Sequence, residues 1–146
     1  QTPRLSSCFD SGNGVLEAYD AAAHEMRVSI RPDPYTEVDG RAHMQWFHFK
    51  VSNLPASPLR VVITNAGECS YIEGWEDYRC AVSTDRRSWT RIAATEYADG
   101  ELRMTLDRDE LGGADAAWLA YFAPHSYEQN MALVARAGAS ALARVR

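Results

Sequence analysis

The residues best suited to metal binding or catalysis are His125-Ser126-Tyr127-Glu128, near the end of the 146-residue chain. The spacing H-x-x-E places an imidazole and a carboxylate one helical turn apart, where both can ligate a zinc ion. A catalytic zinc needs three protein ligands, and no histidine follows His125 in the sequence. The same four residues also suit a helix start, because Glu128 falls in the first turn and complements the helix dipole. The sequence therefore favours a helix N-terminus over a metal site.

The other three histidines, His24, His43 and His48, do not complete a metal site. All of them precede the H-x-x-E motif, with His43 and His48 on one predicted strand and His24 at the start of another. His43 and His48 are an odd number of positions apart, so they point to opposite faces of one strand, with His48 on the side of Trp46. The nucleophile motif G-x-S-x-G is also missing from the sequence. We expect neither a metal ligand set nor a catalytic residue in this chain.

Four tryptophans could build an aromatic platform, as in sandwiches that bind carbohydrate. Most of them are expected in the core, but Trp46 lies opposite the apolar face formed by Phe47, Phe49 and Val51, and Trp75 lies in a predicted loop. Large aromatic side chains in such positions are typical of residues that cover an interface. We expect at least one of these two tryptophans to do so.

The net charge and the cysteines indicate which partners and which cellular setting fit this protein. The formal net charge is −5 and no run of Lys or Arg forms a basic stripe, which argues against nucleic acid or an anionic membrane as partner. The longest apolar stretch, near 116–123, is far shorter than the roughly 20 residues that span a bilayer. Cys8, Cys69 and Cys80 form no C-x-x-C motif and cannot all pair, which favours a reducing, cytoplasmic setting.

Most of the elements that would position these residues are strands, because apolar and polar residues alternate along much of the chain. The segment 59–64 is expected to return antiparallel to 43–53 after the turn at Pro55. Asp99-Gly100 predicts a tight hairpin, since both residues tolerate a positive φ. The predicted strands cover 25–31, 43–53, 59–64, 78–83, 88–95, 101–106 and 118–123.

Only the end of the chain predicts a helix. Ser126 and Gln129 fit a capping box, apolar residues recur at helical spacing, and Gly138 sits where the helix would end. Together with the strands, this predicts an all-β fold, an antiparallel β-sandwich with a C-terminal helix. Its predicted core consists of Met26, Val28, Ile30, Phe47, Phe49, Val51, Val61, Ile63, Leu102, Met104 and Leu106.

Four segments resemble the N-terminal domain of cytosolic-type, bacterial zinc carboxypeptidases. They occur in that family's order and cover nearly the whole chain, although the family usually has a Tyr at the position of His125. The segments are Phe9-Asp10-Ser11-Gly12-Asn13, Trp46-Phe47-His48-Phe49-Lys50-Val51-Ser52-Asn53-Leu54, Ile63-Thr64-Asn65 and Tyr121-Phe122-Ala123-Pro124-His125-Ser126-Tyr127.

The resemblance implies a non-catalytic domain that packs against a C-terminal carboxypeptidase domain and shapes access for polypeptide substrates. The zinc would be held by that absent catalytic domain, with no cofactor in this chain. Residues 1–146 would form one domain, with 1–8 as lead-in, 9–124 as sandwich and 125–146 as helix and start of the interdomain connection. The chain would then be the amino-terminal piece of a longer enzyme that hydrolyses C-terminal peptide bonds.

Three surfaces are candidates for contact with the catalytic domain or the substrate. The segment 10–13 is polar and adjoins a strand start, although a simple turn also explains it. The other two are the face of Trp46 and His48 and the predicted helix from Ser126. The complete candidate set is Asp10, Ser11, Gly12, Asn13, Trp46, His48, Trp75, His125 and Tyr127. The alternative is a stand-alone sandwich that binds carbohydrate or protein.

Overall fold

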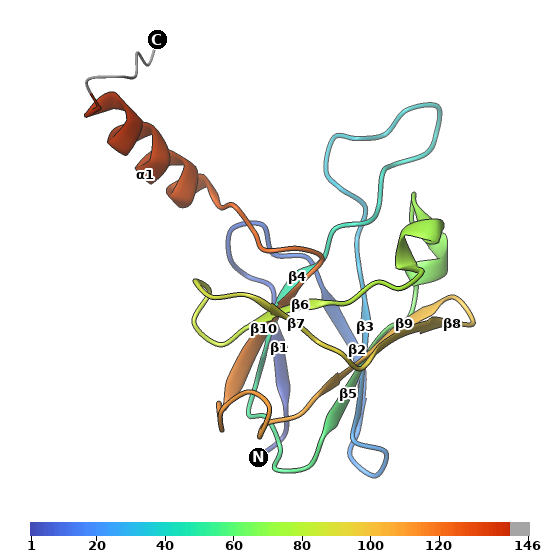
Figure 1. Ribbon diagram of the computed structural model, residues 1–146. Helices are drawn as coiled ribbons and strands as arrows, with labels where there is room; N and C mark the ends of the chain where they lie inside the picture. Colours follow the sequence, from blue (N-terminus) through green and yellow to red (C-terminus); the bar gives the residue numbers. More distant parts are fainter. Residues whose placement is uncertain (141–146) are drawn as a thin grey trace.

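The computed structural model describes residues 1–140 as two five-stranded sheets followed by one helix (Figure 1). The elements in chain order are β1 (Arg4–Ser6), β2 (Val15–Asp20), β3 (Glu25–Ser29), β4 (His48–Ser52), β5 (Leu59–Ile63), the 3₁₀ helices η1 (Ala66–Glu68) and η2 (Ile72–Trp75), β6 (Ala81–Ser83), β7 (Thr90–Arg91), β8 (Thr95–Ala98), β9 (Glu101–Leu106), β10 (Ala116–Ala120) and α1 (Tyr127–Gly138). The all-β, sandwich-like fold expected from the alternation is confirmed.

The first sheet has the order β1-β4-β10-β6-β7, and all its neighbours run antiparallel. Strand β10 lies at its centre, with Leu119 opposite Phe49 on one side and Val82 on the other. Ala117 and Leu119 of this strand are buried in the core, whereas Trp118 on the other face is half-buried and has the ammonium of Lys50 4.8 Å from its ring centroid. Strand β1 lies in the segment expected to be a lead-in and pairs with β4 over its whole length.

The second sheet has the order β2-β3-β5-β9-β8 and corrects the expected pairing of β5. Strand β5 was expected beside β4, but it belongs to the other sheet, where it runs parallel to β3 and antiparallel to β9. The turn after β4 therefore crosses from one sheet to the other. The period of a sequence shows that a segment is a strand and which of its faces is buried. It does not show which sheet the strand joins, because both sheets offer an apolar face for packing.

The core between the sheets contains every residue that the alternation placed there. All eleven are at most 3% exposed, from Phe49 at 0% to Ile30 at 3%, so that prediction is confirmed. The rings of Phe47 and Phe49 lie 5.9 Å apart, and Phe47 also contacts the ring of Trp75 at 6.4 Å. One continuous apolar cluster joins the two sheets.

The structure confirms the predicted hairpin and helix cap, but several strands are shorter than expected: β6 covers 81–83 rather than 78–83, and β7 covers only 90–91 of the expected 88–95. Asp99 and Gly100 connect β8 to β9 with φ values of 54° and 78°, as the tight hairpin requires. Both hydrogen bonds of the capping box at the start of α1 are present. The N–H of Gln129 donates to the hydroxyl of Ser126, and the N–H of Ser126 donates to the side chain of Gln129. Strand β4 begins at His48 rather than at 43, because the preceding residues form loop contacts instead of a ladder.

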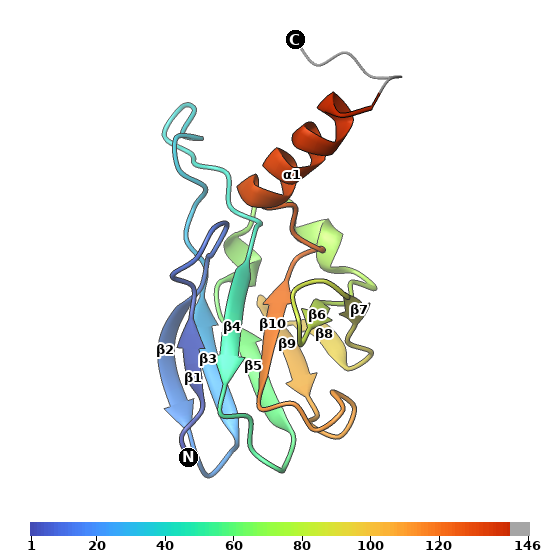
Figure 2. The same ribbon diagram turned by 90° about the vertical axis from the view of Figure 1, so that its left-hand side faces the viewer.

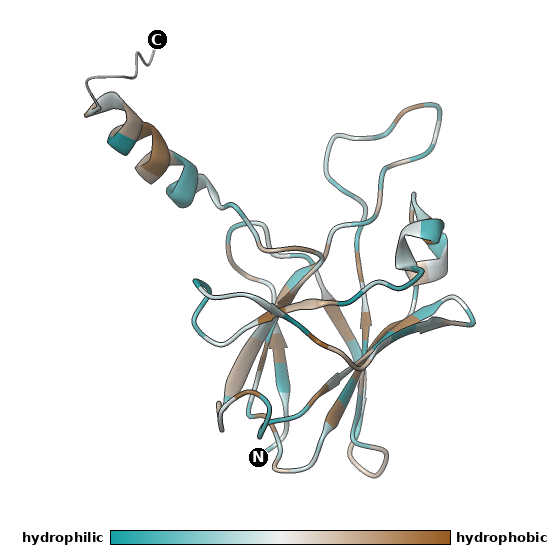
Figure 3. Cartoon of the chain, in the orientation of Figure 1, coloured by the Kyte–Doolittle hydropathy of each residue, from teal (hydrophilic) through white to brown (hydrophobic). Residues whose placement is uncertain are grey.

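Helix α1 and the loop formed by residues 31–47 leave the sandwich at the same end, which we call the exit end (Figures 1 and 2). The N-terminus lies at the opposite end in both views. Helix α1 points away from both sheets and has no buried residue. Hydrophobic residues alternate with hydrophilic ones along it, although no described part of the chain covers it (Figure 3).

Candidate functional site

At the exit end, the backbone of Asn13 pairs with His48 at the first residue of β4. Each residue donates its N–H to the other's carbonyl, at 2.8 and 3.0 Å. The buried Asn13 side chain donates to the carbonyls of Arg31 (2.8 Å) and Trp46 (2.9 Å) and accepts from the N–H of Arg31 (3.0 Å). One amide thus satisfies backbone groups of two other segments, which holds the ends of three chain segments together.

The turn before Asn13 is built around a glycine that cannot be replaced without a shift. A Cβ added to Gly12 would collide with the carbonyl oxygen of Ser7, and the N–H of Gly12 donates to the carbonyl of Phe9 at 2.9 Å. Ser11 next to it adopts a φ of 63°, in the left-handed region. The turn is therefore tight, and it presents Asp10 and Ser11 at the surface.

His48 lies at the centre of this site and is only 2% exposed. Its ring packs against Phe9 (4.8 Å between centroids), Trp89 (5.8 Å) and Trp46 (6.0 Å). Its Nδ1 lies 3.0 Å from the hydroxyl of Ser11. Burial lowers the pKa of His48 to about 4, an effect that Arg86 reinforces and Asp10 opposes. The imidazole is therefore neutral at pH 7.

Trp46 and Asp10 connect this turn to the segment that leads into α1. The indole N–H of Trp46 donates to the carbonyl of Ser11 at 2.7 Å, and its ring lies 4.9 Å from that of Phe122. The carboxylate of Asp10 accepts the backbone N–H of Tyr127, the first residue of α1, at 2.8 Å. A negative group in this position also complements the positive end of the helix dipole. These contacts tie the start of the helix to the sandwich.

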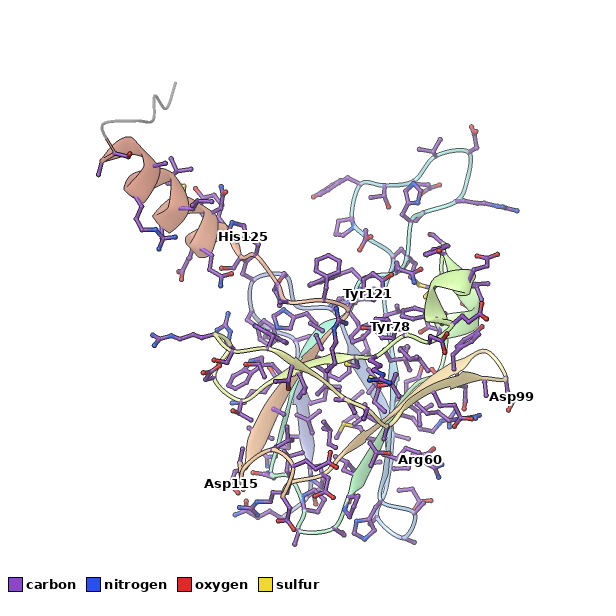
Figure 4. The ribbon with its side chains drawn as sticks, in the orientation of Figure 1. Arg60, Tyr78, Asp99, Asp115, Tyr121 and His125 are labelled. Atoms are coloured by element: carbon purple, nitrogen blue, oxygen red, sulfur yellow. The ribbon has the colours of Figure 1, made fainter. Side chains whose placement is uncertain are left out.

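The structure brings seven of the nine candidate residues together and leaves His125 and Trp75 outside the group. The seven are Asp10, Ser11, Gly12, Asn13, Trp46, His48 and Tyr127. His125 is exposed at the base of α1, in the segment that leads into the helix (Figure 4). Trp75 is 1% exposed and donates to the carbonyl of Ala66, so it is a core residue of this domain and presents no surface to a partner. Its loop position suggested exposure, but η2 turns the indole inward.

Sequence reasoning missed one part of the site, the loop Thr84–Ser88 between β6 and β7. Together with His48, Ser11 and the first turn of α1, this loop lines a pocket of about 410 Å³. It contributes the side chains of Arg86 and Arg87. The available signal was Ser83 followed by Asp85, because such residues accept backbone N–H groups and order a turn. Nothing in the local sequence showed that this turn would face α1.

The pair formed by Ser11 and His48 does not have the properties of a catalytic nucleophile and base. A base for a serine hydroxyl is normally oriented by a third group, and Nε2 of His48 has no hydrogen-bond partner among residues 1–140. A pKa of about 4 also makes the imidazole a weak proton acceptor at pH 7. The contact therefore positions the turn rather than activating the hydroxyl.

Metal-ligating side chains do not gather in the described part of the chain. Among residues 1–140, no group of three or more His, Cys, Asp or Glu side chains could hold a metal ion. Glu128 lines the pocket described above, whereas its motif partner His125 does not. The donor set of a zinc site is therefore missing from these residues. No helix within residues 1–140 is long and apolar enough to cross a membrane.

The fold and the exit-end site define a β-sandwich domain whose last helix is anchored at its start and uncovered along its length. Residues 5–122 match the family described as the cytosolic carboxypeptidase N-terminal domain. The chain belongs to this family.

The chain is also similar to one protein of known sequence and to two metallo-carboxypeptidases of known structure. An uncharacterized protein of Zymomonas mobilis subsp. mobilis is 33% identical over 135 residues, which are 92% of this chain and 32% of that protein. A metallo-carboxypeptidase of Pseudomonas aeruginosa is 32% identical with a TM-score of 0.79, over 92% of this chain and 33% of that one. A metallo-carboxypeptidase of Burkholderia cenocepacia is 25% identical with a TM-score of 0.83, over 97% and 34%. The chain thus spans about a third of the length of these relatives.

Proposed function

We propose that this domain packs against a C-terminal metallocarboxypeptidase domain of the same polypeptide and shapes the access of polypeptide C-termini to it. The whole protein would hydrolyse C-terminal residues with a zinc ion held by that second domain. The cellular setting would be the cytoplasm, which the free cysteines Cys8, Cys69 and Cys80 and the family description support. The two relatives whose names include metallo-carboxypeptidase support the proposed enzymatic class.

The observation that carries the proposal is the uncovered apolar side of α1. Tyr127, Met131 and Val134 share one side of the helix and are 69%, 48% and 38% exposed. Phe122, 51% exposed, lies just before the helix. A 12-residue helix gains little stability in water without packing, so an apolar side of this kind is expected to be buried against a partner.

The polar side of α1 faces the opposite way and shows why the helix holds a defined direction. Glu128 and Gln129 line the pocket next to the sandwich, while the carboxylate of Asp10 holds the N–H of Tyr127. The first turn is thereby fixed to the sandwich, and the apolar side is directed away from it. This arrangement suits a helix that carries the chain from one domain to the next.

The test compares two substitutions on α1 in the full-length protein. Met131→Lys places a charge on the apolar side and is expected to loosen the two domains, since a lysine ammonium resists burial. Ala132→Lys, one position along and turned by about 100° around the helix axis, is the matched control. Limited proteolysis near residue 140 should be faster in Met131→Lys only, and kcat/KM for release of a C-terminal residue should fall in the same variant.

The zinc content of the full-length variants distinguishes an effect on domain packing from an effect on the catalytic site. It should be unchanged in both helix variants and in Asp10→Asn and Trp46→Ala, because these residues are proposed to support the catalytic domain from outside. The isolated chain 1–146 should release no C-terminal residue, with or without added zinc. Identical proteolysis and kinetics in Met131→Lys and Ala132→Lys would contradict the interface, and zinc-dependent cleavage by the isolated chain would contradict the division of roles.

A further inference from the structure

The loop Thr84–Ser88 presents two arginines from an internally ordered turn. The carboxylate of Asp85 accepts the N–H groups of Arg87 and Ser88, both at 2.8 Å, and the hydroxyl of Ser83 at 3.0 Å. These hydrogen bonds hold the pKa of Asp85 near 2, so the carboxylate stays ionised and engaged within its own loop. Arg86 has a φ of 62°, which the same turn maintains with a hydrogen bond from its N–H to the hydroxyl of Ser83.

Neither arginine is neutralised by a carboxylate partner. Within residues 1–140, the ion pairs involve other arginines, and the guanidinium of Arg86 instead lies 5.6 Å above the ring of Phe9. Both arginines line the pocket of about 410 Å³ between this loop and the first turn of α1. Two unpaired guanidinium groups on one pocket wall provide the geometry that carboxylates and phosphates accept.

A second and independent observation comes from the pocket floor. His48 lines the pocket and is 2% exposed, and its Nε2 is the buried side-chain nitrogen that lacks a hydrogen-bond partner among the described residues. When the hydroxyl of Ser11 donates to Nδ1, the single proton of the neutral imidazole resides on Nε2. A buried N–H without an acceptor is costly, so an acceptor that reached this nitrogen would form a favourable hydrogen bond. Trp89 forms the wall above the imidazole.

Two carboxylates also line the pocket, Asp85 in the loop and Glu128 in α1. The carboxylate of Glu128 stands in the first turn of α1, where the helix dipole favours it, and it has no ion pair among residues 1–140. The lining charges therefore balance formally, two guanidinium groups against two carboxylates, although Oδ1 of Asp85 already accepts three hydrogen bonds within its own loop. An anion in this pocket is recognised by hydrogen bonds from the guanidinium groups rather than by net charge, and Glu128 is expected to weaken its binding.

We infer that this pocket binds an oxyanion, a carboxylate or a phosphate group, which Arg86 and Arg87 hold above the imidazole of His48. The oxyanion has two possible sources, a free solute or an acidic side chain of the domain that follows in the full-length protein. In both cases the same guanidinium groups form charge-assisted hydrogen bonds with it. The inference concerns residues of this chain and does not depend on carboxypeptidase activity.

The experiment titrates the chain 1–146 with sodium phosphate and with sodium acetate at constant ionic strength and pH 7. Saturable binding in the millimolar range is expected, observed as a change in the ¹⁵N shift of His48 Nε2 and in tryptophan fluorescence. Arg87→Gln should weaken binding about tenfold, as expected for the loss of one charge-assisted hydrogen bond. Arg86→Gln should weaken it similarly, and Glu128→Gln should tighten it. Arg4→Gln, on β1, is the matched control and should bind normally.

Full-length protein distinguishes the two sources. Binding of phosphate to both forms identifies a free solute as the ligand, whereas binding to 1–146 alone identifies an internal carboxylate that already fills the pocket. The inference is overturned if neither anion saturates the chain 1–146. It is also overturned if Arg87→Gln and Arg4→Gln weaken binding equally, because the effect would then be general electrostatics rather than a site.

Discussion

The core of the sandwich and helix α1 differ in how their apolar side chains are covered. Phe47 and Phe49 are fully buried between two sheets, whereas Met131 and Leu133 on α1 are each 48% exposed. The sandwich therefore contains its own stabilising contacts. Helix α1 is defined by its capping box and by the contact with Asp10 at its first residue, not by packing. Under the proposed function, α1 gains its apolar packing from a partner outside the described residues.

The largest expected effect is in the core. Phe49→Ala should lower the free energy of unfolding of the chain 1–146 by about 3–5 kcal/mol, because it leaves a cavity between the sheets. Phe122→Ala, at a side chain that is 51% exposed, is the control and should cost less than about 1 kcal/mol. Urea denaturation followed by circular dichroism measures both. Equal losses would show that the exit end is as tightly packed as the core.

The buried imidazole at the exit end should make stability depend on pH. The pKa of His48 is about 4 in the folded chain and 6.5 in its ordinary state, so the unfolded chain binds the extra proton between these values. Stability is therefore lost as the pH falls from 6.5 toward 4, by up to about 3 kcal/mol. His48→Gln should flatten this dependence in urea titrations at several pH values, while His125→Gln should preserve it. A pH dependence that survives in His48→Gln would assign it to other groups.

Asn13 should rank next, because it satisfies the backbone of two other segments from a buried position. Asn13→Ala removes one acceptor and two donors and should destabilise the chain by about 1–3 kcal/mol. The exposed Asn130→Ala on α1 is the matched control and should be nearly neutral. Thermal unfolding of both variants tests this order. A neutral Asn13→Ala would mean that water replaces the amide at no cost.

The smallest effect should be confined to α1. Ser126→Ala removes the acceptor for the N–H of Gln129 and should destabilise the first turn of the helix by about 1 kcal/mol, with no change in the unfolding of the sandwich. Ser126→Asp keeps an acceptor and should restore the turn. Amide hydrogen exchange at Gln129 and Asn130 detects the local change. A cooperative loss of stability in the sandwich would show that the helix and the core form one unit.

Much of the core could be predicted from the sequence because burial on one side of a strand leaves a local signal of alternating residues. Met26 and Val28 on β3 and Leu102, Met104 and Leu106 on β9 follow this signal and are buried. Strands β1 and β2 were both missed. Strand β1 has three residues, too few for a period to be read, and β2 is exposed along most of its length, so it carries no signal of a buried face. The alternation also could not show that β5 leaves the sheet of β4, because the choice of neighbour depends on long-range packing.

The sequence named seven residues that the structure places in one cluster, but their role as a contact surface stays a prediction. Asp10, Ser11 and Trp46 came from a family resemblance and from polarity or aromatic character, and the structure shows that hydrogen bonds join them. His48 was placed correctly on the side opposite the core phenylalanines. Its burial depends on Phe9 and Trp89, which come from distant parts of the chain.

Sequence alone determined the features whose causes lie within a few residues. These are the alternating strands, the hairpin at Asp99-Gly100 and the capped start of α1 at Ser126, and each follows from local backbone preferences and side-chain period. Only the tertiary structure decided which sheet each strand joins, that Trp75 turns inward, and that Arg86 and Arg87 face the first turn of α1. These outcomes depend on contacts between residues far apart in sequence, and no local pattern records such contacts.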